Sequence, residues 1–189
     1  MADQPQIRLA TRRDIPEILA MIRELATYEH ALDSVKATEA LLSQTLTFAP
    51  SPADATADTS SKPQTFASTF ILTAPAEDGQ KEGSVAGMAL FYHTYSTWLA
   101  RPGIYLEDLF VRPAYRRRGY ATLLLKELAK ETQRINGGRL EWSCLRWNES
   151  ALKFYRGLGA EEMEEWVGLR VDGERLGKLS ELEVDTKGS

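Results

Sequence analysis

The stretch 107–121 holds the residues best suited to chemistry, because two adjacent carboxylates are followed by a run of arginines and a glycine. Its pattern predicts a strand, a turn and then a helix. The first amides of such a helix lack intrahelical partners and lie at the positive end of the dipole, so a pyrophosphate is their natural ligand. Gly119 and Ala121 let a ligand approach the backbone. Beside them stand three cationic side chains, Arg116, Arg117 and Arg118.

A basic loop before a helix also occurs in proteins that bind nucleic acid. That reading requires a wider basic stripe. This chain of 189 residues has 23 Lys and Arg against 27 Asp and Glu, for a formal net charge of −4. The sequence therefore predicts no nucleic-acid partner. The net negative charge would attract a cationic substrate, and it also helps to keep a protein in solution.

The two carboxylates could act on a cationic substrate. If that substrate is an alkyl amine, its pKa is about 10.4, so making it neutral at pH 7 costs roughly 4 to 5 kcal/mol. A general base must take that proton, and a carboxylate also attracts the cationic amine. In a regular strand Glu107 and Asp108 point to opposite faces, so they share one task only if a bulge intervenes.

The hydrophobic pattern gives the elements that must position these residues. Predicted strands lie at 7–10, 66–73, 84–95, 104–111, 140–145 and 166–171. Predicted helices lie at about 15–26, 38–46, 121–135 and 148–157. This alternation indicates a mixed α/β sheet with helices on both faces.

One domain over residues 1–189 is expected from the length. Residues 48–62 are rich in Ala, Ser, Thr, Pro and Asp, which predicts a flexible surface insertion. The single cysteine, Cys144, can form neither an internal disulfide nor a zinc cluster, so we expect a reducing, cytoplasmic location and no metal site. The sequence shows no secretory leader and no stretch long enough to span a bilayer, so no membrane partner is expected.

The stretch 116–121 resembles the acetyl-CoA loop of the GNAT superfamily of N-acetyltransferases, Arg/Gln-x-x-Gly-x-Gly/Ala. The resemblance runs from residue 7 to about residue 178 and implies a mixed, mostly antiparallel central sheet flanked by helices. Tyr105-Leu106-Glu107-Asp108 and Trp147-Asn148-Glu149 are similar to the spermidine/spermine (diamine) and thialysine N-acetyltransferases. Tyr95-Ser96-Thr97-Trp98 is more similar to the thialysine branch, because the spermidine branch usually has an acidic residue at the position of Ser96.

The resemblance implies acetyl-CoA as co-substrate and a primary amine of a small lysine-like or polyamine molecule as acceptor. Glu107 would act as the base, and Tyr155 as the acid that protonates the departing thiolate. The implied cofactor-binding residues are Leu109, Phe110, Val111, Arg116, Arg117, Arg118, Gly119, Tyr120, Ala121, Asn148 and Tyr155. The implied substrate-binding residues are Tyr28, Glu29, Trp98, Glu107 and Asp108.

Other readings stay open at this point. Glu29 is equally readable as a solvated charge at a helix end, and Trp98 as a loop-packing or interface residue. The acceptor could instead be a protein lysine or an N-terminus, and a CoA-binding regulatory module without turnover is a further alternative. A homodimer is implied by the resemblance alone.

Overall fold

The computed structural model describes residues 4–50, 64–76 and 82–183. The predicted insertion at 48–62 therefore lies almost entirely outside the described residues. The chain divides into two units, residues 1–143 and residues 144–189.

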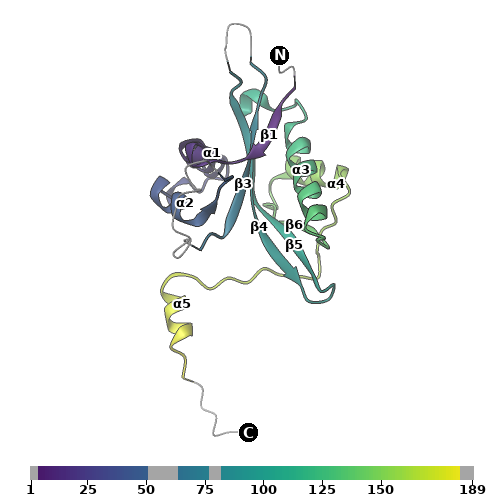
Figure 1. The fold of residues 1–189 in the computed structure, drawn as a ribbon. Coiled ribbons are helices and arrows are strands. Elements are labelled where there is room, and N and C mark those ends of the chain that lie inside the picture. The colour runs from purple at the N-terminus through teal and green to yellow at the C-terminus, as the bar shows by residue number, and fades with distance from the viewer. Residues whose placement is uncertain (1–3, 51–63, 77–81, 184–189) are drawn as a thin grey trace. The chain divides into compact units, whose positions relative to one another are not determined.

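The first unit is built on a six-stranded sheet (Figure 1). Its strands are β1 (Gln6–Leu9), β2 (Leu46–Thr47), β3 (Ala67–Thr73), β4 (Val85–Ser96), β5 (Arg101–Val111) and β6 (Leu140–Trp142). The spatial order is β1-β3-β4-β5-β6, with β2 paired to β3. Pairing is antiparallel from β1 to β5, whereas β2 with β3 and β5 with β6 are parallel. The predicted mixed and mostly antiparallel sheet is confirmed.

Helices α1 (Ile15–Tyr28) and α2 (Glu39–Thr45) cover one face of this sheet (Figure 1). Apolar residues at helical spacing give α1 a buried side, which packs with the strands into one core. That core includes Ile18, Met21, Leu42, Ile71, Met88, Leu90 and Phe110. Short 3-10 turns lie at Arg12–Asp14, Leu32–Ser34 and Pro113–Tyr115.

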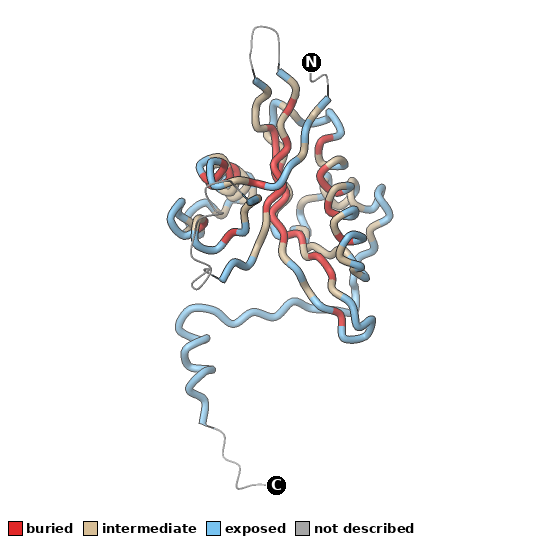
Figure 2. Tube along the Cα trace, viewed as in Figure 1, coloured by how far each residue is buried: buried red, intermediate tan, exposed pale blue. Residues whose placement is uncertain are grey.

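Helix α3 (Tyr120–Arg134) lies on the other face (Figure 1). Leu124, Leu125 and Leu128 are its buried apolar residues in mid-helix. The sheet residues of that face are buried as well, among them Leu72, Ala89, Phe91, Ile104 and Leu106. In Figure 2 the buried residues follow the middle of the strands and the inward sides of α1 and α3. Helices on both faces are thus confirmed.

The second unit holds α4 (Glu149–Gly157) and α5 (Gly173–Ser180). The predicted strand at 166–171 is wrong: these residues form no strand, and Trp166, Val167 and Leu169 are exposed. A run of β-forming residues becomes a strand only where a partner strand completes its hydrogen bonds. The strand predicted at 140–145 ends at Trp142, and α5 was not predicted.

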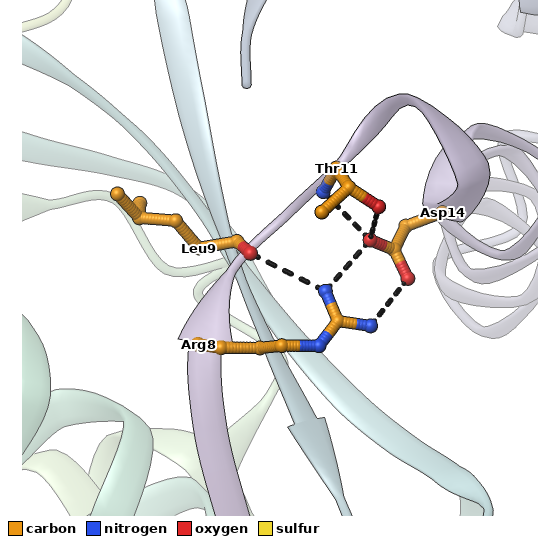
Figure 3. Close-up of polar contacts among 4 residues, drawn as sticks. All are labelled: Arg8, Leu9, Thr11 and Asp14. Atoms are coloured by element: carbon orange, nitrogen blue, oxygen red, sulfur yellow. Dashed lines mark hydrogen bonds and ion pairs between the residues drawn. The ribbon is translucent and has the colours of Figure 1, made fainter. Parts of the chain in front are cut away.

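An ion pair next to β1 fixes the entry to α1 (Figure 3). Both guanidinium Nη atoms of Arg8 donate to the Asp14 carboxylate at 2.7 Å, and the backbone N–H and hydroxyl of Thr11 donate to it at 2.7 and 2.8 Å. Burial alone would raise the pKa of Asp14, but the Arg8 and Thr11 hydrogen bonds and the Arg8 charge lower it to about 2.

Asp14→Asn is therefore expected to lower the free energy of unfolding by about 1 to 2 kcal/mol at pH 7. The folded-state pKa lies below the ordinary value of 3.8, so this stabilisation is present above pH 4 and is lost as the pH falls toward 2. Urea unfolding of both proteins at pH 7 and pH 3 checks this. Asp33→Asn, at an exposed site, is the control. A difference that stays the same at both pH values would contradict the prediction.

Candidate active site

A β-bulge interrupts the pairing of β4 with β5. Phe91 pairs with Leu106 and Leu90 pairs with Asp108, so Glu107 is the extra residue on β5. Up to Leu106 the even-numbered residues of β5 face α3, whereas after the bulge they face the α1 core, as buried Phe110 shows. The bulge thus turns Asp108 toward the face that Glu107 also occupies. Glu107 and Asp108 therefore lie on one face of the sheet.

Glu29 and Glu107 lie near enough to Asp108 for their charges to act on its carboxylate, and these three residues are called the acidic cluster. Glu29 directly follows α1 as its C-cap residue. Burial, and then the negative charges of Glu107 and Glu29, raise the pKa of Asp108 to about 6. Burial also raises the pKa of Glu29. A concentration of negative charge in partly desolvated surroundings is a site for a cation.

Two tyrosines that the sequence motifs do not single out for a role, Tyr92 and Tyr105, flank the cluster. The rings of Tyr92 and Tyr105 stack across β4 and β5 with centroids 5.2 Å apart, and the Tyr105 hydroxyl lies 2.6 Å from Ser143 Oγ. Burial and the nearby charge of Glu107 raise the pKa of Tyr92. Alternation along β5 could have placed Tyr105 on this face, but Tyr92 depends on the cross-strand register.

Beside the cluster, β5 continues beyond its parallel partner. In the described register β6 pairs with β5 only from Ile104 to Leu106. The N–H of Arg112 donates to the Ala86 carbonyl of β4 at 2.9 Å. Because amide directions alternate along a strand, the Leu109 and Val111 amides point to the edge away from β4. The amide of Phe110, a third implied cofactor-binding residue, points toward β4 instead. The edge away from β4 can hold a carbonyl group of an extended ligand.

The segment 112–119, called the arginine loop below, connects β5 to α3. Gly119, the N-cap residue of α3, has φ 78°, and Arg117 has φ 62°. A Cβ at Gly119 would meet no atom within 4 Å, so glycine is favoured there by backbone conformation rather than by space. At the start of α3, Leu123 N donates to Gly119 O at 3.0 Å. The amides before Leu123 lie at the N-terminal end of the helix, where a bound anion is stabilised.

Side chains of the arginine loop are anchored on the first unit. Arg112 forms ion pairs with Glu17 at 2.8 Å and Glu24 at 3.1 Å, which tie the loop to α1. The Arg118 guanidinium lies 5.4 Å from the centre of the Tyr115 ring. The Arg112 ion pairs fix the start of the loop on α1, and the contact between Arg118 and Tyr115 lies within the loop.

Three further predicted residues belong to other segments of the chain. Trp98 lies in the turn between β4 and β5 and is 88% exposed. That turn is roughly 17 Å along the strands from the bulge, so within the chain Trp98 does not join the acidic cluster. Tyr155 and Asn148 belong to the second unit. Asn148 caps α4 by accepting from Ala151 N at 3.3 Å, and the Tyr155 ring lies 5.3 Å from that of Phe154.

Across residues 4–50, 64–76 and 82–183, no group of three or more His, Cys, Asp or Glu side chains is arranged to hold a metal ion. In the same part of the chain, no helix has the length and apolar character needed to cross a bilayer.

Comparisons with known proteins identify the family of this chain. A family model described as the acetyltransferase (GNAT) family matches residues 38–160. L-ornithine N5-acetyltransferase of Arabidopsis thaliana is 35% identical over 203 aligned residues, which cover 95% of this chain and 89% of that protein. Thialysine N-epsilon-acetyltransferase of Bos taurus is 36% identical over 178 residues, which cover 92% of this chain and 96% of that protein.

Among solved structures, an integron cassette protein from the mobile metagenome of V. cholerae has a TM-score of 0.68 at 22% identity. The match covers 94% of this chain and 98% of that chain, which shows a shared fold. The family match spans more than half of the sequence, and the relatives are aligned over nearly all of it. This chain therefore belongs to the acetyltransferase (GNAT) family and is an acyltransferase enzyme.

Proposed function

We propose that this enzyme transfers an acetyl group from acetyl-CoA to the terminal amine of a small lysine-like molecule. The observation that carries the proposal is the bulge at Glu107, which gathers the acidic cluster beside the free edge of β5. The names of the two relatives specify the side-chain amine of ornithine and of thialysine. Both are short basic amino acids, which favours a lysine-like acceptor over a longer polyamine.

The residues present fit acetyl-CoA in two places. The amides at the start of α3, together with the side chains of Arg117 and Arg118, would hold the pyrophosphate. The Leu109 and Val111 amides would hold the thioester carbonyl and stabilise negative charge that develops on its oxygen. When bound, acetyl-CoA supplies the activated acyl group.

Glu107 is the proposed base. It is exposed at the bulge, so a proton can reach it directly or through a water molecule. Asp108 and Glu29 would attract the cationic amine, and Glu107 would then remove its proton so that the neutral nitrogen can attack. Tyr155 is the proposed acid for the departing thiolate, supported by the match of its helix to the family pattern.

The pKa of Asp108 gives a test of amine recognition. Because its carboxyl ionises near pH 6, the wild-type enzyme should bind a cationic amine better above that pH than below it. The ratio of kcat/KM between the wild type and Asp108→Asn is expected to be near one at pH 5 and about ten above pH 7. Steady-state kinetics between pH 5 and pH 8 measure the ratio. A ratio that does not change with pH would show that Asp108 does not bind the amine.

Competition among acceptors tests the function as a whole. Free-thiol release from acetyl-CoA is measured with ornithine, thialysine, lysine, spermidine, spermine and a basic peptide. The proposal predicts the highest kcat/KM for one of the basic amino acids. A preference for the peptide would favour a protein acetyltransferase, and no release with any acceptor would favour a binding module.

A further inference from the structure

We infer that the Arg116 guanidinium is a positioning group that ties the arginine loop to the two segments carrying the acidic cluster. In this reading it is not the ligand of the acetyl-CoA pyrophosphate that the family pattern implies. The inference rests on the proposed function, because it assigns Arg116 a role within that site.

Arg116 makes three contacts with its own chain. Its guanidinium carbon lies 5.5 Å from the centre of the Tyr28 ring and 5.7 Å from the centre of the Phe110 ring. Both distances are within the range of a cation–π interaction. Its Nε donates to the Val111 carbonyl at 2.9 Å. The side chain is thus held between the end of α1 and the end of β5.

The partners of Arg116 adjoin the acidic cluster. Tyr28 is the last residue of α1 and directly precedes Glu29. Phe110 follows Asp108 by two residues and is buried on the same face. A side chain that contacts both rings therefore fixes the end of the helix relative to the strand. That spacing sets how closely Glu29 approaches Asp108.

The third contact, with the Val111 carbonyl, lies next to the edge of β5 that is proposed to hold the thioester. The Val111 carbonyl, which accepts from Arg116, belongs to the residue whose amide points away from β4. Arg116 thereby orients the peptide next to the edge proposed to hold the thioester arm. Arg116 therefore helps to position both the carboxylates that bind the amine and the peptide that holds the acyl group.

Kinetics with two acetyl donors distinguish a positioning role of Arg116 from a role as phosphate ligand. Acetyl-CoA carries the pyrophosphate, whereas S-acetylpantetheine carries the thioester arm without it. For Arg116→Gln we expect kcat/KM for the amine to fall about tenfold with both donors, the size expected from losing two cation–π contacts. Most of the loss should appear as a higher KM for the amine, with the KM for acetyl-CoA changed less than twofold.

Arg117→Gln is the matched control, because Arg117 is the next residue of the loop and adjoins the Gly119 turn. It is expected to raise the KM for acetyl-CoA and to leave the reaction with S-acetylpantetheine unchanged. If Arg116→Gln showed that same pattern, Arg116 would be a phosphate ligand and the inference would be wrong. An equal fall in kcat for all substrates, with amine KM unchanged, would show a merely structural role and would also overturn it.

A stability cycle tests the contact without using activity. Urea unfolding of Arg116→Gln, Tyr28→Leu and the double variant should give non-additive changes, because either single change breaks the same contact. Additive changes would overturn the inference. If instead the cycle is non-additive and the wild type transfers no acetyl group to any amine, the proposed function fails while the link between Arg116 and Tyr28 stands.

Discussion

Glu107→Gln is expected to lower kcat/KM for the amine about a hundredfold at pH 7, the usual contribution of a general base. Glutamine keeps the size of the side chain but cannot accept the proton from the ammonium group. The loss should shrink as the pH rises toward 10, because the amine then loses its proton in solution. Initial rates of thiol release between pH 6.5 and pH 10 measure this recovery.

Glu127→Gln is the control for this change. Glu127 pairs with Lys130 at 2.8 Å on α3, on the opposite face of the sheet, so its variant should keep wild-type kinetics. A Glu107→Gln defect of constant size across the pH range would contradict the role of base. It would leave Glu107 as a group that attracts the amine.

Tyr155→Phe is the second change with a large expected effect. Removing the hydroxyl should lower kcat about a hundredfold, because the thiolate then departs without a proton donor. The ring is retained, so the packing of Tyr155 beside Phe154 should persist. The dissociation constant of acetyl-CoA, measured by titration calorimetry, should change less than twofold.

The control variant removes a tyrosine hydroxyl outside the proposed site. Tyr95 lies near the end of β4 and is 62% exposed, so Tyr95→Phe should have no effect on kcat. Unchanged turnover in Tyr155→Phe would exclude the role of acid. Weaker acetyl-CoA binding with unchanged kcat would make Tyr155 a binding residue only.

Helices α1 to α4 and the central strands could be predicted because their patterns are local. Apolar spacing predicts α1 and α3, and Thr38 caps α2 through its side chain, which accepts from Leu41 N at 3.2 Å. The strand expected at 166–171 failed for the opposite reason. The residue pattern indicates that Trp166 and Leu169 suit a strand, but it does not show whether a partner strand is available to pair with them.

The site was only partly predictable for a related reason. Gly119 and the arginines beside it form one continuous motif, so the loop could be recognised. The bulge is a property of two strands together, and the sequence of β5 alone does not show that Glu107 lacks a partner on β4. The contact of Arg116 with Tyr28 joins residues 88 positions apart in the chain, and only the folded structure reveals it.

Identification of the acetylated nitrogen tests the central claim most directly. Ornithine is incubated with acetyl-CoA and the enzyme, and NMR of the product shows which amine carries the acetyl group. We predict acetylation of the terminal side-chain amine, with Glu107→Gln forming the same product slowly at pH 7. Acetylation of the α-amine, or of a basic peptide but no free amino acid, would contradict the account.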